Sequence, residues 1–208
     1  DPVYEAQAGE KETDFRSYLL KAKATNPDAL VCSGLVDETV RCLVQSYEVG
    51  IPKSVARVAN SVASKVEVPT NAGKAAVGVS YAAAFAASDT RPIAKKFVKH
   101  IKSRYGVVPG HDFSQMEDLL TMLKPALEKA EKQFSGDLAS DRKAVRDSIA
   151  GITNFTGLAS GPISFCAAGS PECRDGNRTP VMIEYTKGGK NWKTKVAGTV
   201  TFNASAGL

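Results

Sequence analysis

The sequence has few of the residues from which enzymes most often build active sites and metal centres. Its 208 residues include two histidines, four cysteines and one tryptophan. It contains no Gly-x-Ser-x-Gly elbow, no phosphate-binding P-loop, no Gly-x-Gly-x-x-Gly turn and no His-Glu-x-x-His helix. His111 and Asp112 form the nearest approach to an acid–base pair, and we expect these neighbours on a Pro-Gly turn to face solvent. We therefore expect a binding protein that is not an enzyme and has no catalytic residue, cofactor or metal site.

Long apolar runs are also missing. The longest candidate, residues 75–87, is interrupted by Gly78 and Ser80 and is shorter than the roughly 18 residues of a membrane-spanning helix. With 43% hydrophobic and 24% charged residues, the composition is that of a folded globular protein and excludes collagen-like and wholly disordered classes. We expect one large domain or two small ones, not embedded in a membrane.

Basic residues outnumber acidic ones by 27 to 22, which gives a formal net charge of +5. The densest basic stretch extends from Arg91 to Arg104, with Ile93, Phe97 and Ile101 on the opposite side at helical spacing. Nucleic-acid-binding surfaces combine clustered basic residues with aromatic residues or with a helix that enters a groove. We interpret the stretch as the solvated face of a helix and expect no nucleic-acid partner.

The four cysteines form two pairs that are close in sequence. Cys166 and Cys173 flank a turn-rich segment, which a disulfide would stabilise by roughly 2.5 kcal/mol. A zinc site is the alternative, but paired zinc ligands are usually two to four residues apart. We expect a disulfide, and hence an oxidising compartment. Cys32 ends an apolar strand and Cys42 lies slightly off the buried stripe of the next helix, so we expect these two to be packed free thiols.

The first part of the chain alternates between helical and strand patterns. Thr13 is placed to cap a helix that ends at the sequence Asn26-Pro27-Asp28. A second helix ends at Gly50, and a polar, partly helical stretch occupies residues 61–73. Strands separated in this way predict parallel βαβ units with right-handed crossovers. The expected strands are residues 29–32, 55–59 and 76–81.

The pattern changes after Thr90, where three helical segments follow one another. The expected helices are residues 92–105, 113–134 and 140–150, the second kinked at Pro125 and the third capped by Ser140. After Gly151 the pattern favours strands again. The expected strands are residues 161–165, 180–186 and 192–196, with a hairpin turn at residues 187–190.

Five segments resemble a known family in the same order along the chain. They are Thr13-Asp14-Phe15 with residues 19–30 (LLKAKATNPDAL), then residues 47–52 (YEVGIP), 97–106 (FVKHIKSRYG), 143–149 (KAVRDSI) and 161–165 (GPISF). On these segments the chain resembles the periplasmic solute-binding proteins of ABC transporters, in the branched-chain amino acid (leucine/isoleucine/valine) group.

The resemblance implies the type I periplasmic-binding fold, in which two α/β lobes hold a solute at the carboxyl ends of parallel strands. Residues 1–88 would be an α/β segment of the C-terminal lobe. Residues 89–178 would belong to the N-terminal lobe, with helices at 92–150 and a strand at 161–165. Residues 179–208 would be a crossover strand, a hairpin and a tail. We therefore expect an α/β fold in which a parallel-sheet lobe accompanies part of an incomplete second lobe.

The resemblance places five residues at the solute site: Gly34, Leu35, Asn60, Ser61 and Phe85. Leu35 falls where the family has an aromatic residue, and Ser61 falls where it has Asp or Glu for the solute ammonium. A buried ammonium without a carboxylate is costly. We expect weak binding of branched-chain amino acids and better binding of aromatic or aliphatic carboxylates. Phe85 keeps the aromatic character of its crossover position, and either contacts the solute or packs in the hinge.

These expectations define a function and two kinds of partner. The chain would be part of a periplasmic protein, secreted by a signal peptide that this sequence does not contain, which delivers a small organic solute to an ABC transporter permease. The alternative is a ligand-sensing or interaction module on the same scaffold. In the family, a sheet covers the apolar faces of helices 92–150. We therefore expect either self-association through these helices or association with the remaining lobe.

Overall fold

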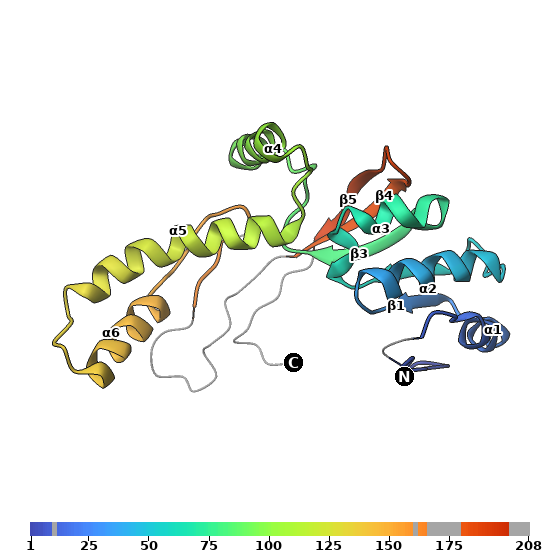
Figure 1. Ribbon diagram of the computed structural model, residues 1–208, viewed down its shortest axis with the longest axis horizontal. Helices are drawn as coiled ribbons and strands as arrows, with labels where there is room; N and C mark the ends of the chain where they lie inside the picture. Colours follow the sequence, from blue (N-terminus) through green and yellow to red (C-terminus); the bar gives the residue numbers. More distant parts are fainter. Residues whose placement is uncertain (10–11, 160–161, 166–179, 200–208) are drawn as a thin grey trace. The chain divides into compact units, whose positions relative to one another are not determined.

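The chain folds as two compact units (Figure 1). The computed structural model describes residues 1–9, 12–159, 162–165 and 180–199. The first unit comprises residues 1–83 and 182–198, and the second comprises residues 84–181 and 199–208. The chain therefore leaves the first unit after Ala83 and re-enters it at Met182. The expected disulfide between Cys166 and Cys173 lies outside the described residues.

The first unit is built on a five-stranded sheet in which neighbouring strands follow one another in sequence order. The first three strands are parallel, with Cys32 aligned to Ala59 and Ala59 aligned to Tyr81. The strands are β1 (Ala29–Cys32), β2 (Ala56–Ala59), β3 (Val79–Ala83), β4 (Val181–Lys187) and β5 (Lys193–Thr199). The mixed α/β fold with parallel βαβ units is confirmed. The third strand begins later than expected, because residues 73–76 form a 3₁₀ helix.

Helices cover one side of this sheet. They are α1 (Arg16–Ala24), α2 (Val36–Glu48), η1 (Ser61–Ser64), α3 (Glu67–Ala72) and η2 (Gly73–Ala76). Helix α2 contacts α1, α3 and β1. Cys32, Ala59 and Tyr81 share one side of the sheet through the strand register, and all three are buried. Val31, which points to the other side, is 65% exposed.

A disulfide joins Cys32 at the end of β1 to Cys42 in α2, with their Cα atoms 5.9 Å apart. The expectation of two free thiols is therefore wrong. The alternation along β1 turns Cys32 toward the helices, and Cys42 packs beside the core cluster of Phe15, Leu19 and Ile51, which brings the two sulfur atoms together. The bond closes a loop across ten residues, which by chain entropy is worth about 3 kcal/mol.

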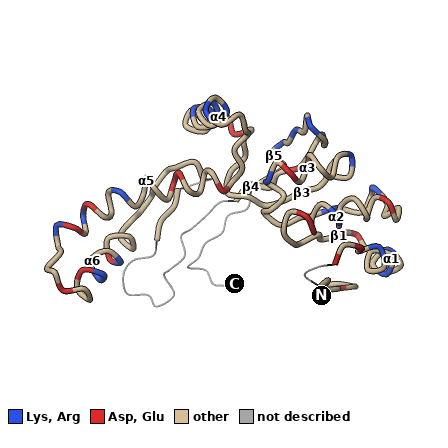
Figure 2. Tube along the Cα trace, in the orientation of Figure 1, with Lys and Arg blue, Asp and Glu red and all other residues tan. Residues whose placement is uncertain are grey.

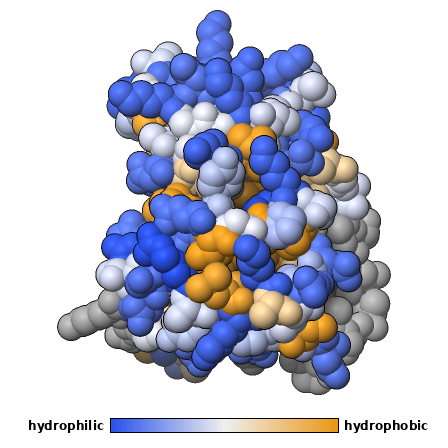
Figure 3. All heavy atoms as spheres, turned by 90° about the vertical axis from the view of Figure 1, so that its right-hand side faces the viewer, coloured by the Kyte–Doolittle hydropathy of each residue, from blue (hydrophilic) through white to orange (hydrophobic). Residues whose placement is uncertain are grey.

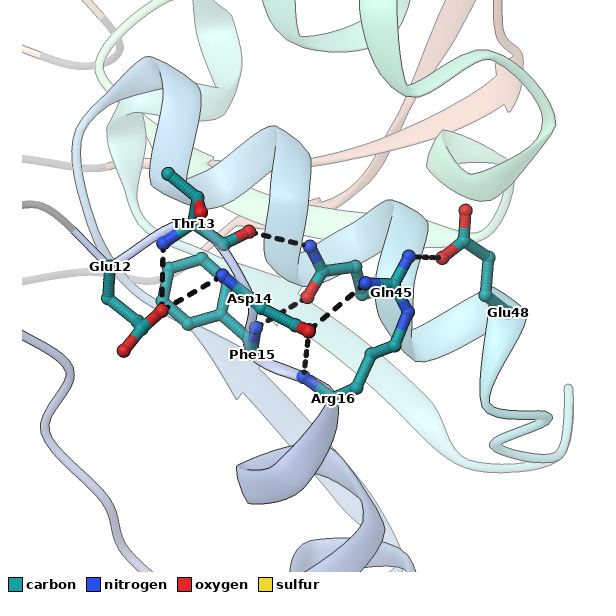
Figure 4. A network of polar contacts seen from close by, with 7 residues as sticks. All are labelled: Glu12, Thr13, Asp14, Phe15, Arg16, Gln45 and Glu48. Atoms are coloured by element: carbon teal, nitrogen blue, oxygen red, sulfur yellow. Dashed lines mark hydrogen bonds and ion pairs between the residues drawn. The ribbon is translucent and has the colours of Figure 1, made fainter.

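Polar contacts fix the start of α1 against α2 (Figure 4). Gln45 of α2 accepts a hydrogen bond from the Phe15 N–H and donates one to the Thr13 carbonyl oxygen. Arg16 bridges Asp14 and the Glu48 carboxylate. The Arg16 N–H holds the pKa of Asp14 below its usual value. No side chain caps α1, so the expected cap at Thr13 is wrong. Thr13 contributes its backbone carbonyl oxygen, which accepts the hydrogen bond from Gln45.

The hairpin of β4 and β5 packs against the rest of the first unit through Tyr185 and through a close approach of Gly188 to Gly73. Tyr185 is buried, donates a hydrogen bond to the Ala63 carbonyl oxygen, and lies 5.3 Å from the ring of Tyr81. Burial raises the pKa of Tyr81 to about 12. At the turn, a Cβ atom on Gly188 would lie 1.8 Å from the Gly73 carbonyl oxygen, so only glycine fits there.

The second unit contains helices α4 (Pro92–Tyr105), α5 (His111–Glu131) and α6 (Leu138–Ala150), of which α5 and α6 pack together. The three expected helices are confirmed. Pro125 lies inside α5. The cap of α6 is Asp137, whose carboxylate accepts a hydrogen bond from the Ser140 N–H, so the expected cap at Ser140 is wrong. In place of the expected strand at 161–165, Ile163 and Phe165 form isolated bridges, and the partner of Ile163 is Phe155.

A buried carboxylate organises the centre of this unit. Asp118 of α5 is 4% exposed and accepts hydrogen bonds of 2.7 Å from the N–H groups of both Leu158 and Ala159. Arg91 donates to the carbonyl oxygens of Gly157 and Leu158 and pairs with Asp89. The segment 157–159 is thus held from two sides. A Cβ atom on Gly157 would collide with Asp118.

Helix α5 also presents an exposed apolar stripe. Its members recur at helical spacing and are 41–62% exposed: Phe113, Met116, Leu119, Leu120 and Leu127. Leu120, Leu123 and Leu127 line a groove together with Phe134. No described residue is shown to cover this stripe. On the face of the molecule drawn in Figure 3, hydrophobic residues gather in patches between hydrophilic ones.

Among the described helices, none is both long and apolar enough to cross a membrane.

Candidate functional site

The carboxyl ends of β1 and β2 bring two of the predicted site residues together. Gly34 lies in the loop between β1 and α2, and Asn60 directly follows β2. The two parallel strands end level with each other, at Cys32 and Ala59, so the loops that follow them are neighbours. The Asn60 side-chain amide donates a hydrogen bond of 2.9 Å to the Gly34 carbonyl oxygen. This edge of the sheet is the candidate functional site.

Glycine is required at position 34 because the first turn of α2 lies against the loop. A Cβ atom there would be 2.8 Å from the Cβ of Glu38. The buried Thr39 hydroxyl lies 3.4 Å from the Gly34 carbonyl oxygen, the same atom to which Asn60 donates. The loop is therefore held by α2 and by the next loop.

Leu35 and Ser61 lie beside these two residues in the sequence and differ in exposure. Leu35 is 73% exposed, has an extended backbone and immediately precedes α2. No side chain caps that helix, so the peptide N–H groups of its first turn have no capping side-chain acceptor. Ser61 is half-buried and begins η1. The site therefore presents an apolar side chain, a hydroxyl group and backbone donors.

Phe85 belongs to the second unit. It is 2% exposed and packs with Ala94 and Leu158 in a core cluster, with its ring edge-on to Phe97 at 5.8 Å. The sequence left two roles open for Phe85: contact with the solute or packing in the hinge. Its contacts with Ala94, Phe97 and Leu158 are those of a packing residue next to the crossover.

Two buried oxygen atoms near Gly34 accept no hydrogen bond from the described residues: Oδ1 of Asn60 and Oε2 of Glu38. The orientation of the Asn60 amide follows from its partner, because the Gly34 carbonyl oxygen can only accept and so must face the NH₂ group. Glu38 was not predicted from the sequence. The available signal was an acidic residue in the first helical turn after a Gly-containing loop, a pattern that is common for electrostatic reasons alone.

Among residues 1–9, 12–159, 162–165 and 180–199, no three His, Cys, Asp or Glu side chains are grouped so that they could hold a metal ion. His111 and Asp112, in the first turn of α5, contact each other at 2.8 Å, so the expectation that they face solvent rather than each other is wrong.

Comparisons with known proteins identify the family. A family model described as periplasmic binding protein matches residues 3–174. The fold is similar to that of the leucine-binding protein LivK from Thermotoga maritima, with 24% identity, a TM-score of 0.73, and coverage of 91% of this chain and 49% of that chain. It is similar to the substrate-binding protein LivJ from Streptococcus pneumoniae in complex with isoleucine, with 22% identity, a TM-score of 0.71, and coverage of 93% and 50%.

A third similar structure is a solute-binding protein of an ABC transporter from Rhodopseudomonas palustris in complex with 3,4-dihydroxybenzoic acid, with 22% identity, a TM-score of 0.69, and coverage of 92% and 49%. No curated protein matches the sequence. The chain spans about half the length of these solved proteins. The family match covers all five segments that carry the resemblance. The chain belongs to the periplasmic binding protein family.

Proposed function

We propose that this chain is part of the solute-binding component of an ABC transporter and delivers a small organic solute to the permease. The observation that carries the proposal is the junction of Gly34 and Asn60 at the carboxyl edge of a parallel sheet, in a chain of the periplasmic binding protein family. Open α/β sheets bind their ligands at this edge. The proposed solute contacts on this side are Gly34, Leu35, Asn60 and Ser61. Phe85 acts by packing next to the crossover.

The ligand class we propose is an aromatic or aliphatic carboxylate. Leu35 offers an exposed apolar side chain for the body of such a solute. The Ser61 hydroxyl and the uncapped N–H groups at the start of α2 are donors for its carboxylate. Neither Leu35 nor Ser61 carries a negative charge that could form an ion pair with an ammonium group.

Glu38 favours a second ligand class. Its Oε2 is a buried acceptor without a donor among the described residues, and its Cβ lies next to Gly34. If the solute carries an ammonium group, Glu38 is the carboxylate near this edge that would pair with it. An amino acid would then bind despite the neutral residues at positions 35 and 61.

The Cys32–Cys42 disulfide supports an extracytoplasmic location, because such bonds persist in oxidising compartments. Two of the similar proteins are described as transporter binding proteins, which favours delivery to a permease over a sensing module.

Calorimetric titration of the 208-residue chain tests the proposal. We expect benzoate or 3,4-dihydroxybenzoate to bind more tightly than isoleucine, and Asn60→Ala to weaken binding about tenfold through loss of the loop junction. Asn71→Ala, an exposed amide on α3, is the matched control and should bind as the parent does. Equal affinities for the two variants, or no binding of either ligand class by the parent, would contradict the proposal. Tight isoleucine binding that Glu38→Gln abolishes would establish the second ligand class instead.

A further inference from the structure

Helix α4 carries the whole net charge of the chain. Within Pro92–Tyr105 there are five basic residues and no Asp or Glu: Lys95, Lys96, Lys99, Lys102 and Arg104. The chain has 27 Lys and Arg against 22 Asp and Glu, so without these five the remaining basic and acidic residues are equal in number. The rest of the chain is formally neutral. A net charge of +5 on one 14-residue helix is a local feature that composition alone does not show.

The four lysines of α4 point to solvent because the other side of the helix is packed. Ala94 and Ile101 are buried, and Phe97 and Val98 are partly buried against Phe85 and its neighbours. The lysines are all exposed, and Figure 2 shows basic positions in blue on α4. Lys95, Lys99 and Lys102 follow the i, i+4, i+7 spacing of one helix face and extend over about 10 Å. These three line a shallow groove with Ala87, Val98 and Ser103.

The charges on this face have no counter-charge within the described chain. None of the four lysines forms an ion pair with a described residue. Exposed cations on other elements do: Arg16 pairs with Asp14 and Glu48, and Lys143 and Arg146 both pair with Asp147. The mutual repulsion of the four lysines is therefore offset from outside the described residues or by salt.

The composition of this face distinguishes between kinds of anionic partner. Protein interfaces are built around aromatic or other apolar anchors and are depleted in lysine, and bidentate recognition of carboxylates favours arginine. The middle of the outward side of α4 carries lysine, and the exposed apolar residues of the helix, Ile93 and Tyr105, lie at its two ends. Lysine clusters of this kind bind the diffuse negative charge of a lipid surface, to which each contributes independently.

We propose that the face formed by Lys95, Lys96, Lys99 and Lys102, the α4 lysine face, binds anionic phospholipid headgroups at a membrane surface. The contact is peripheral, because the apolar side of α4 is used in the core of the second unit. Its ligand is the phosphate of the headgroup, and its strength depends on the number of lysines rather than on a fixed geometry. The proposal concerns a different surface from the solute site and needs no solute.

Vesicle sedimentation with the 208-residue chain tests this inference. We expect the chain to bind vesicles of phosphatidylcholine containing one-third phosphatidylglycerol at low salt, and to be released at about 0.5 M salt. Lys99→Gln/Lys102→Gln should weaken binding roughly 25-fold, since each lysine near an anionic surface contributes about fivefold. The matched control is Lys124→Gln/Lys129→Gln on α5, which removes the same charge from two other exposed lysines. It should bind within about threefold of the parent.

Three results would overturn the inference: equal binding to pure phosphatidylcholine, equal weakening by the two double variants, or retention of polyglutamate without any binding of phosphatidylglycerol vesicles. The last result would assign the face to an acidic protein. Competition by inorganic phosphate at millimolar concentration would also count against a lipid surface, because a multivalent surface is not displaced by a single phosphate group. If only this inference fails, the same variants should still bind the solute with the affinity of the parent. Failure of this inference can therefore be distinguished from failure of the proposed function.

Discussion

The two units of the chain are held together by different kinds of contact. In the first unit, a disulfide joins β1 to the helix that follows it across ten residues, and three parallel strands succeed one another along the chain. In the second unit, Asp118 bonds to the backbone 40 residues away, and Arg91 reaches a carbonyl group 66 residues away. The first unit thus combines a local cross-link and successive strands with one long return, in which Tyr185 donates a hydrogen bond to the Ala63 carbonyl oxygen 122 residues away. The second unit depends on a few buried polar contacts between distant segments and has no disulfide among its described residues.

The largest test of this difference is Asp118→Ala. The substitution leaves the buried N–H groups of Leu158 and Ala159 without acceptors, and each unpaired buried donor costs about 1–3 kcal/mol. We expect the free energy of unfolding of the second unit to decrease by about 4 kcal/mol. Hydrogen exchange should show faster exchange in α5 and α6 and unchanged protection in β1–β3.

Glu117→Gln is the control for this variant, because it removes a carboxylate from the exposed neighbouring position of α5. Its stability should match that of the parent within about 0.5 kcal/mol. Equal losses in the two variants would show that Asp118 contributes charge rather than hydrogen bonds.

The corresponding test in the first unit is the double variant Cys32→Ala/Cys42→Ala. Loss of the cross-link should lower the free energy of unfolding by about 3 kcal/mol, and the effect should be confined to β1, β2 and α2. Urea unfolding monitored by hydrogen exchange measures both quantities. Alkylation of both thiols in the folded, non-reduced parent would contradict the disulfide and remove the reason for the expected loss.

The smallest expected effect concerns Asp89 and pH. Burial raises the pKa of this carboxyl group, but hydrogen bonds from Arg91 outweigh burial and hold the pKa below its usual value. The stabilising contribution is therefore complete above the unfolded-state pKa of about 3.9 and is lost as the pH decreases through the folded-state value. Asp89→Asn should remove this part of the acid sensitivity of the second unit, a change below about 1 kcal/mol between pH 6 and pH 3. A parent and variant with identical pH profiles would contradict it.

Local signals in the sequence predicted much of the fold, and contacts between distant residues explain most of what it missed. The bounds of α4 are correct because Pro92 begins the helix and Gly106, with its left-handed backbone, ends it. The cap of α6 was assigned to Ser140 because the hydroxyl and the Asp137 carboxylate are both good caps three residues apart, and only the structure shows which one accepts the hydrogen bond. The hydrogen bonds that Asp118 accepts from Leu158 and Ala159 join distant segments and leave no periodic pattern in the sequence, so they could not be predicted.

The candidate site shows the same division. Gly34 and Asn60 follow successive parallel strands, so their proximity follows from topology and could be predicted. The position of Phe85 next to a crossover did not determine whether its ring faces a solute or a core, because that depends on Phe97 and Leu158. The Cys32–Cys42 bond was missed for a similar reason: a small angular error on α2 separates a packed thiol from a bonded one.

The return of the chain to the first unit has a consequence for synthesis on the ribosome. Strand β4 lies next to β3 in the sheet, but almost 100 residues separate the end of β3 at Ala83 from the start of β4 at Val181. During translation the edge of β3 is therefore made long before the strand that pairs with it. At about 5–20 residues per second, this unpaired edge persists for roughly 5–20 s. An exposed strand edge is a template for pairing with other chains, so the nascent protein is most open to misassembly while the second unit is being translated.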